Sequence, residues 1–239
     1  MIKIMDLKRF FVKDKIIGDQ IILEGEEFYH AIKVTRHKVG YSIIVCDNTD
    51  IDYYAKITAI NKDHLIAKIE KKEKNVAEAT QSVTLYLGIH KDIDESVQKA
   101  VELGIKRIVP FTSQHGNIDS VNYERLNKII LESSKQCGRS QLTVLEKAVS
   151  FAQAIQDAKE TNLLLFYEYE SENKIGNVKL KDDTSVAIFI GSEGGFSVEE
   201  IEYAKNKNVQ ILTLGKRILR VSTAVVAAIT LCMARLGEM

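Results

Sequence analysis

Cysteine is scarce in this chain of 239 residues. Cys46, Cys137 and Cys232 lie far apart, form no Cys-x-x-Cys pair and have no metal-ligand spacing with the five histidines. The pattern therefore predicts no metal site. Free thiols are typical of a reducing compartment, so we expect a cytoplasmic protein.

Long hydrophobic runs are also missing. The first residues, MIKIMDLKRFF, are charged and contain no secretory hydrophobic stretch. No apolar segment reaches the roughly 20 residues that a membrane-spanning helix needs. The sequence therefore predicts a protein that neither enters a membrane nor carries a secretion signal.

The chain has no net charge, because 33 basic residues balance 33 acidic ones. No global field draws it to nucleic acid, so any RNA site must be a local cluster. Apolar residues make up 45% and charged residues 28% of the chain, which is ordinary for a soluble globular protein. The length allows one large domain or two small ones.

The last third of the chain carries two glycine-bearing loops. The first, GSEGGFS at 191–197, follows the apolar run TSVAIFI, and the second, LGKRILR at 214–220, follows VQILTL. A helix-like segment follows each loop. Two consecutive strand–loop–helix units put both loops at the carboxyl ends of strands, where ligands bind in open α/β sheets.

The first loop lacks a phosphate-binding pattern. It has neither Gly-x-Gly-x-x-Gly spacing nor a Gly-Lys-Ser/Thr ending, and Glu193 puts a carboxylate where an anion would sit. These features favour a neutral or cationic ligand, or the adenosine part of one. The alternative is an ordinary tight turn before a helix, for which Ser197 and Glu200 fit a capping box.

The second loop carries three cations, Lys216, Arg217 and Arg220, beside apolar residues. Such a loop can meet a polyanion, although a solvated turn is the simpler interpretation for Lys216. The helix predicted over residues 222–236 is apolar on nearly all sides, which is typical of a buried helix. It therefore lies in the core or packs against a second subunit.

IGSEGGFS followed by LGKRILRVSTAVVAA resembles the paired carboxyl-terminal motifs of SPOUT methyltransferases, above all the ribosomal RNA small subunit methyltransferase E (RsmE) family. The resemblance implies a mostly parallel α/β sheet with a carboxyl-terminal trefoil knot that grips S-adenosylmethionine (SAM), and a homodimer. One departure stands out. The family's Thr-Glu-Thr-Ala is VSTA at 221–224 here, which removes a carboxylate, although Ser222 can cap the helix.

Residues 1–72 are β-rich, with short apolar and β-branched runs between turn-forming residues, which predicts a small barrel. RFF near the start and the spacing of His30 and Arg36 resemble the PUA-like RNA-binding domain of the RsmE family. The resemblance implies RNA contacts by Arg9 and Arg36, the alternative being a solvated surface. Residues 73–80 are charged, polar and small, which predicts a linker.

Residues 81–239 alternate strand-like and helix-like segments, which predicts parallel strands with helices on both faces. Ile93, Val97 and Val101 share one helical face, and Gly104 fits the end of that helix. Lys91 with Lys99, QCGR at 136–139 and FYE at 166–168 also resemble RsmE motifs.

The family resemblance implies roles for these residues. Lys91 and Lys99 are expected to contact RNA, although an exposed helix face is the alternative for Lys99. Arg139 is expected to enter the active site, the alternative being a cation that favours a helix dipole. The residues expected to bind SAM are Phe166, Gly191, Gly195, Leu214, Gly215, Ile218 and Leu219.

RsmE enzymes methylate N3 of a uridine in 16S ribosomal RNA. Loss of the N3 proton spreads negative charge onto both carbonyl oxygens, so cations aimed at these oxygens favour the reactive anion. We expect Arg139 and Arg220 to act in this way. No general base is obvious: Glu193 is the nearest carboxylate by motif, and water is the alternative acceptor of the proton.

Two alternatives are left open. An RNA-binding protein that kept the SPOUT fold but lost catalysis fits the departure at Ser222 and the zero net charge. An enzyme that uses ATP or NAD on an unknotted sheet is less favoured, because the loop at Glu193 has no phosphate motif.

Overall fold

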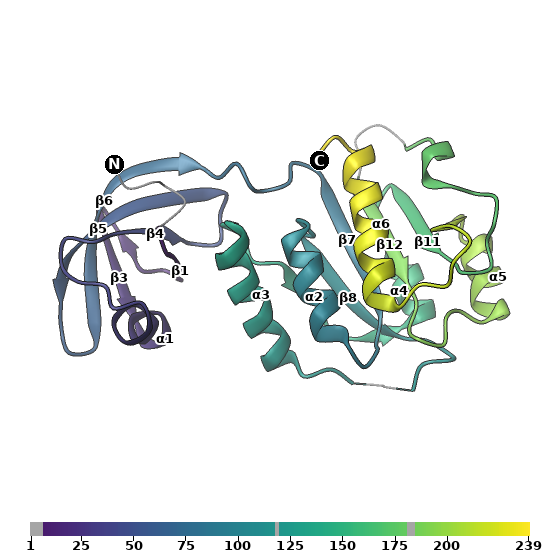
Figure 1. The fold of residues 1–239 in the computed structure, drawn as a ribbon, viewed down its shortest axis with the longest axis horizontal. Helices are drawn as coiled ribbons and strands as arrows, with labels where there is room; N and C mark the ends of the chain where they lie inside the picture. Colours follow the sequence, from purple (N-terminus) through teal and green to yellow (C-terminus); the bar gives the residue numbers. More distant parts are fainter. Residues whose placement is uncertain (1–6, 118–119, 181–184) are drawn as a thin grey trace. The chain divides into compact units, whose positions relative to one another are not determined.

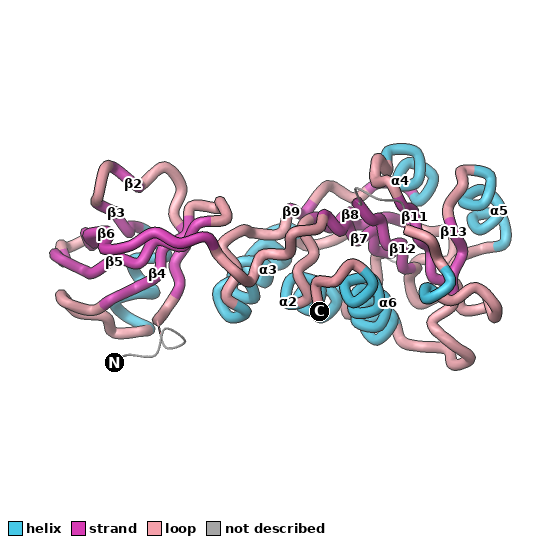
Figure 2. Tube along the Cα trace, turned by 90° about the horizontal axis from the view of Figure 1, so that it is seen from above, coloured by secondary structure: helices cyan, strands magenta, loops and turns pink. Residues whose placement is uncertain are grey.

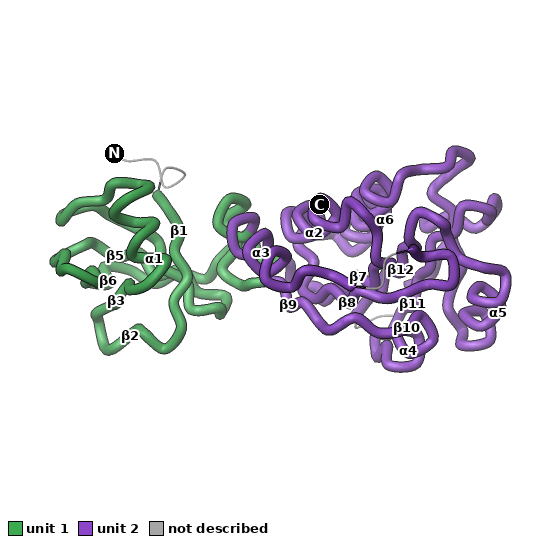
Figure 3. Tube along the Cα trace, turned by 90° about the horizontal axis from the view of Figure 1, so that it is seen from below, with its two compact units in different colours: residues 1–78, 134–142 green, residues 79–133, 143–239 purple. Residues whose placement is uncertain are grey.

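The computed structural model describes residues 7–117, 120–180 and 185–239 (Figure 1). The prediction made on the first residues, MIKIMDLKRFF, therefore falls mostly outside the described residues. The chain divides into two compact units, residues 1–78 with 134–142 and residues 79–133 with 143–239 (Figure 3). Over the described ranges, no helix combines the length and the apolar character that a membrane crossing requires.

Unit 1 is built on a mixed six-stranded sheet with the strand order β1-β4-β5-β6-β3-β2. Its strands are β1 (Arg9–Phe11), β2 (Ile16–Ile17), β3 (Gln20–Glu24), β4 (Ser42–Cys46), β5 (Ile51–Ile60) and β6 (His64–Lys74). β1 and β4 are parallel, and the other pairs are antiparallel. The prediction of a β-rich first domain is confirmed. Over the described residues, β1 and β2 are the two edge strands and do not pair with each other.

A short helical segment covers this sheet between β3 and β4. It consists of α1 (Gly25–Tyr29), which continues directly into the π-helix η2 (His30–Val34). Apolar side chains of the strands alternate toward one buried core that contains Phe10, Ile21 and Leu65. Arg36, just after the π-helix, is exposed and has a positive φ of 56°.

A buried polar cluster in unit 1 is centred on Asp52. The Asp52 carboxylate pairs with Arg9 and accepts hydrogen bonds from Asn75 at 3.0 Å and from the Ser140 hydroxyl at 2.6 Å. Burial acts to raise the pKa of Asp52, but hydrogen bonds from Arg9, Ser140 and Asn75 outweigh it and lower that pKa. These bonds fix segment 134–142 on a sheet that is distant in sequence.

Glu78 holds the same segment as well. Its carboxylate pairs with Arg139 at 3.2 Å and accepts the backbone N–H groups of Ser140 and Gln141 at 2.8 and 2.7 Å. Glu78 lies in the stretch 73–80, whose first two residues are the last two of β6. That stretch therefore takes part in the packing of unit 1.

Unit 2 is built on an all-parallel sheet with the order β10-β8-β7-β12-β11-β13, and β9 pairs with β8. Its strands are β7 (Ser82–Gly88), β8 (Arg107–Thr112), β9 (Val144–Leu145), β10 (Val149–Ser150), β11 (Asn162–Phe166), β12 (Ser185–Ile190) and β13 (Gln210–Leu212). The central strands are nearly continuous apolar runs, as expected for strands covered on both faces. The predicted parallel sheet is confirmed.

Helices cover both faces of this sheet, with α4 and α5 on one side and α2 and α6 on the other (Figure 2). The helices of unit 2 are α2 (Ile93–Glu102), α3 (Tyr123–Cys137), α4 (Phe151–Asp157), α5 (Val198–Asn206) and α6 (Val221–Arg235), with a 3₁₀ turn, η3 (Ile175–Asn177). α3 begins in unit 2, and its residues from Ser134 on are grouped with unit 1.

The helix ends test three sequence predictions. Gly104 follows α2 with a φ of +87°, as predicted. Ser197 and Glu200 form the predicted capping box of α5, with hydrogen bonds of 3.1 and 2.9 Å. The cap predicted for Ser222 is wrong, because α6 begins one residue earlier and Arg220 occupies the N-cap position without a side-chain cap.

A charged cluster ties three strands of unit 2 together. Glu160, which precedes β11, accepts hydrogen bonds from Arg107 at 2.7 Å and from the Tyr86 hydroxyl at 3.2 Å. Burial acts to raise the pKa of Glu160, but hydrogen bonds from Thr84 and Arg107 outweigh it and lower that pKa. The ionised carboxylate therefore stabilises the fold.

We predict that Glu160→Gln lowers the free energy of unfolding at pH 7 by about 1–3 kcal/mol, the usual loss for a buried charged hydrogen bond. The folded pKa lies below the ordinary value of 4.5. The contribution is thus present above pH 4.5 and is lost as the pH falls through the folded pKa. The free energies of unfolding of the wild-type protein and of Glu160→Gln should therefore become more alike as the pH falls. Urea unfolding of the two proteins between pH 3 and 7 measures this difference.

Glu146→Gln is the matched control, because Glu146 faces the same arginine at 3.9 Å but is 46% exposed. An exposed pair contributes less than about 1 kcal/mol. The role of the buried carboxylate would be contradicted if both variants lost the same free energy of unfolding. It would also be contradicted if the loss in Glu160→Gln did not depend on pH.

Candidate functional site

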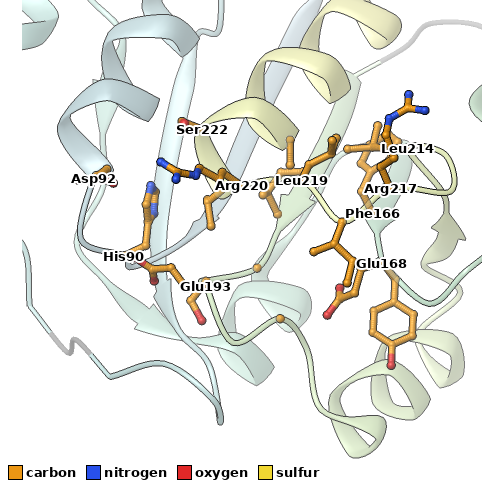
Figure 4. A pocket seen from close by; sticks show the side chains of 18 of the residues that line it. His90, Asp92, Phe166, Glu168, Glu193, Leu214, Arg217, Leu219, Arg220 and Ser222 are labelled. Atoms are coloured by element: carbon orange, nitrogen blue, oxygen red, sulfur yellow. The ribbon is translucent and has the colours of Figure 1, made fainter.

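A cavity of about 560 Å³ opens in unit 2 at the carboxyl ends of β7, β11, β12 and β13 (Figure 4). Its wall comes from four segments, within residues 90–95, 166–168, 190–195 and 214–224. The volume is within the range of roughly 300–1,000 Å³ typical of small-molecule sites. Its position is the one expected for a ligand site in a parallel sheet.

The structure brings together all the residues predicted to bind the cofactor. Phe166 comes from the end of β11, and the others come from the two glycine-bearing loops. Those that line the cavity are Phe166, Gly191, Gly195, Leu214, Gly215, Ile218 and Leu219. The contacts that each makes with a ligand remain predictions.

Glycines let the first loop approach its neighbours closely. A Cβ on Gly88, the last residue of β7, would lie 2.6 Å from the carbonyl carbon of Gly191 and 3.1 Å from the Cα of Ser192. Gly195 has a φ of +69°, and a Cβ there would overlap the Glu168 carboxylate. The ends of β7 and β12 therefore meet backbone to backbone, and the loop turns over β11.

One end of the cavity, which we call the apolar end, holds large apolar side chains with Glu168 and Arg217 beside them. Phe166 and Leu214 lie there, with Leu219 toward the middle of the cavity (Figure 4). The loop around them is shaped by Thr213, whose hydroxyl accepts the N–H of Gly215 at 3.0 Å. Apolar walls with free backbone groups suit a flat aromatic ring such as adenine.

The other end is polar, and we call it the polar end: His90, Asp92, Glu193 and Arg220. The Glu193 carboxylate accepts the backbone N–H of Lys91 at 2.8 Å. The guanidinium of Arg220 points toward His90 and the first turn of α2 (Figure 4). Within the described ranges Arg220 forms no ion pair, so its charge is open to a ligand.

Of the residues predicted to be catalytic, Arg220 and Glu193 line the cavity and Arg139 does not. Arg139 is 2% exposed, belongs to unit 1 and pairs with Glu78. Sequence spacing could not show this, because the partner carboxylate is 61 residues away. Within this chain, Arg139 anchors the segment 134–142.

The residues predicted to bind RNA lie in different environments. Lys91 lines the cavity, and Lys99 pairs with Glu102 on the surface of α2 at 3.0 Å. Arg9 is 9% exposed and pairs with Asp52, so a phosphate contact by Arg9 requires that ion pair to open. Arg36 is exposed and available to a polyanion.

The sequence analysis missed His90 and Asp92 as cavity residues, whereas Tyr167 and Glu168 belong to the FYE motif that it singled out. A signal for the first two residues was present. His90 and Asp92 follow β7, whose carboxyl end opens onto the cavity as the carboxyl ends of parallel strands at a ligand site do.

Comparisons with known proteins agree with this geometry. A family model of the RNA methyltransferase domain matches residues 77–233, and a model of the RNA methyltransferase PUA domain matches residues 23–70. The first model therefore matches most of the chain, and both glycine-bearing loops lie within it.

Two curated relatives share one name. The ribosomal RNA small subunit methyltransferase E of Mesomycoplasma hyopneumoniae is 31% identical over 234 residues, which is 94% of this chain and 98% of that protein. The protein of the same name from Rickettsia conorii is 29% identical over 234 residues, 94% of each chain.

A solved structure matches as well. The crystal structure of this methyltransferase from Neisseria gonorrhoeae, bound to S-adenosyl methionine, has a TM-score of 0.87 and 26% identity, covering 96% of this chain and 98% of that one. From the family models, the sequence relatives and the fold together, the chain belongs to the ribosomal RNA small subunit methyltransferase E family.

Proposed function

We propose that this protein transfers a methyl group from SAM to N3 of a uridine in 16S ribosomal RNA. The observation that carries the proposal is the cavity itself. All the predicted cofactor residues line it, together with an unpaired arginine and a carboxylate held by a backbone N–H. The relative from Neisseria gonorrhoeae, described as bound to S-adenosyl methionine, supports the choice of cofactor.

The chemistry of the cavity fits SAM. Phe166, Leu214 and Leu219 supply apolar walls for the adenine ring. SAM carries a sulfonium and an ammonium group, and the carboxylates of Glu168 and Glu193 favour such a cation. The same carboxylates disfavour the phosphates of ATP or NAD. When bound, SAM supplies an electrophilic methyl group on sulfur.

Arg220 and Glu193 act on the uracil ring in this proposal. The guanidinium of Arg220 stabilises the negative charge that develops on the uracil carbonyl oxygens. Glu193 takes the N3 proton, and the nitrogen lone pair forms the new bond to carbon as the carbon–sulfur bond breaks. The products are N3-methyluridine, S-adenosylhomocysteine and one proton on the carboxylate.

Unit 1 serves, in this proposal, to hold the RNA around the target. Arg36 is exposed beyond the π-helix η2, with Lys33 and Lys38 exposed on either side in sequence. Cations clustered along one short segment favour phosphate contacts, which position RNA without reading its sequence. We assign residues 1–72 to this RNA-binding domain, 73–80 to the connection and 81–239 to the methyltransferase domain.

We also propose the trefoil knot and the homodimer. β11 lies between β12 and β13, so the chain crosses back past β11 after the first glycine-bearing loop. On α6, Val225 and Ile229 are buried against the unit, whereas Leu231 is 43% exposed. An apolar helix with a partly exposed apolar face suits a subunit interface.

Arg220→Ala is expected to lower kcat about 10²- to 10³-fold, because it removes charge stabilisation in the transition state. Glu193→Gln is expected to lower kcat about 10²-fold or more, because an amide accepts no proton. Methyl transfer from labelled SAM to small ribosomal subunits measures both. Reverse transcription, which stops at an N3-methylated uridine, locates the product.

Lys216→Ala is the matched control, because this cation lies on the same loop but does not line the cavity. It should keep the wild-type kcat. Wild-type protein that binds RNA but gives no heat on calorimetric titration with SAM would favour an RNA-binding protein without catalysis and end the proposal.

Arg36→Ala is expected to weaken binding to small-subunit RNA severalfold and to reduce the salt dependence by about one counterion. SAM affinity should not change, since Arg36 is in unit 1. Filter binding between 50 and 200 mM salt measures the slope. Lys62→Ala, an exposed cation elsewhere in unit 1, is the control; equal losses in both variants would indicate a non-specific charge effect.

Leu231→Glu is expected to convert a dimer into a monomer, because it places a charge in the proposed interface on α6. Light scattering after size exclusion measures the mass. Val198→Glu, at an apolar residue of α5 that is 63% exposed, should leave the mass unchanged. A monomeric wild-type protein would refute the interface.

A further inference from the structure

The turn between β7 and α2 carries a buried histidine to which the mechanism above gives no role. His90 lines the cavity, yet its side chain is only 2% exposed. Both ring nitrogens have partners, Nδ1 with the carbonyl oxygen of Gly88 at 2.9 Å and Nε2 with the Ser96 hydroxyl at 2.9 Å. The ring is therefore fixed between the end of β7 and the first turns of α2.

These partners determine the tautomer of the neutral ring. A carbonyl oxygen can only accept, so Nδ1 carries the proton and donates it to Gly88. Nε2 then accepts the hydroxyl hydrogen of Ser96, a side chain that is fully buried on α2. The side chains of the next two residues, Lys91 and Asp92, are exposed.

The fixed turn holds a residue of the proposed reaction. The N–H of Lys91, one residue after His90, donates to the Glu193 carboxylate at 2.8 Å. The position of that N–H depends on the backbone of residues 88–92. The His90 ring restrains this backbone through its hydrogen bonds to Gly88 and Ser96. Gly88 in turn touches the backbone of Gly191 and Ser192, so the two strand ends and the carboxylate form one assembly.

We propose that His90, with Ser96, is a positioning residue for methyl transfer, one that acts through the N–H of Lys91 on the carboxylate of Glu193. The inference rests on the proposed function of this cavity and deepens it. His90 does not touch the substrate, because its ring is enclosed and both of its nitrogens are already bonded. Its effect is on where the carboxylate stands relative to the N3 proton.

The test compares three variants with one control. His90→Ala removes both bonds, Ser96→Ala removes only the second, and His90→Asn keeps a donor near the Nδ1 position. Thr143→Val is the matched control, because Thr143 is buried in the same unit and its hydroxyl donates to the carbonyl of Ile105 at 2.8 Å, away from the cavity. Each change removes buried hydrogen bonding, so all are expected to lower Tm.

Only the variants at His90 and Ser96 are expected to lower kcat. His90→Ala should lower it about 10- to 100-fold, the usual effect of a misplaced catalytic group. Ser96→Ala should lower it less, and His90→Asn should restore part of the loss. The KM for SAM should stay within about twofold of wild type, because the apolar end at Phe166 and Leu214 is not altered.

A double mutant separates positioning from general damage. If His90 acts through Glu193, then His90→Ala in the Glu193→Gln background should cause no further loss of kcat. Additive losses, or a full kcat in His90→Ala, would overturn the proposal. If His90→Ala does not fold, Ser96→Ala and His90→Asn in the same background give the same comparison.

A second readout does not need activity. Hydrogen exchange at the Lys91 amide should become at least about tenfold faster in His90→Ala and Ser96→Ala, and stay unchanged in Thr143→Val. Unchanged exchange would refute the positioning role even in an active enzyme. If exchange is faster in the two variants but the wild-type protein transfers no methyl group, the effect of His90 on the Lys91 amide stands and only the proposed reaction is refuted.

Discussion

The site depends on the close contact between the ends of two neighbouring parallel strands. Gly88 at the end of β7 leaves no room for a Cβ against Gly191 and Ser192, so the two backbones meet directly. This contact places the first glycine-bearing loop beside the turn that begins α2. The Glu193 carboxylate then reaches the N–H of Lys91 at 2.8 Å, and the polar end of the cavity is formed.

The two units use charge in different ways, because Asp52 and Arg139 of unit 1 are buried whereas Arg220 of unit 2 is exposed. In unit 1, Asp52 and Glu78 accept hydrogen bonds from segment 134–142 and hold it on a sheet that is distant in sequence. In the cavity of unit 2, Arg220 forms no ion pair among the described residues and its guanidinium points into the polar end. A paired arginine is structural, and an unpaired one in a cavity is open to a ligand.

Much of the site was readable in the sequence because its signal is local. The loops GSEGGFS and LGKRILR each follow an apolar run, and a parallel sheet brings the carboxyl ends of its strands to one edge. The capping box at Ser197 is local too, since it needs only a fixed spacing to Glu200. The cap expected at Ser222 was wrong because helix starts are uncertain by a residue or two.

The sequence by itself determined the alternation of strands and helices, the two loops and the residues that line the apolar end of the cavity. Only the tertiary structure decided which charged side chains are paired with a buried partner and which are open to a ligand. The sequence analysis expected Arg9 to contact RNA and Arg139 to enter the active site, yet each side chain is buried against a carboxylate many residues away. Hydrophobic periodicity and loop motifs act over a few residues, whereas an ion pair between distant segments exists only once the chain has folded.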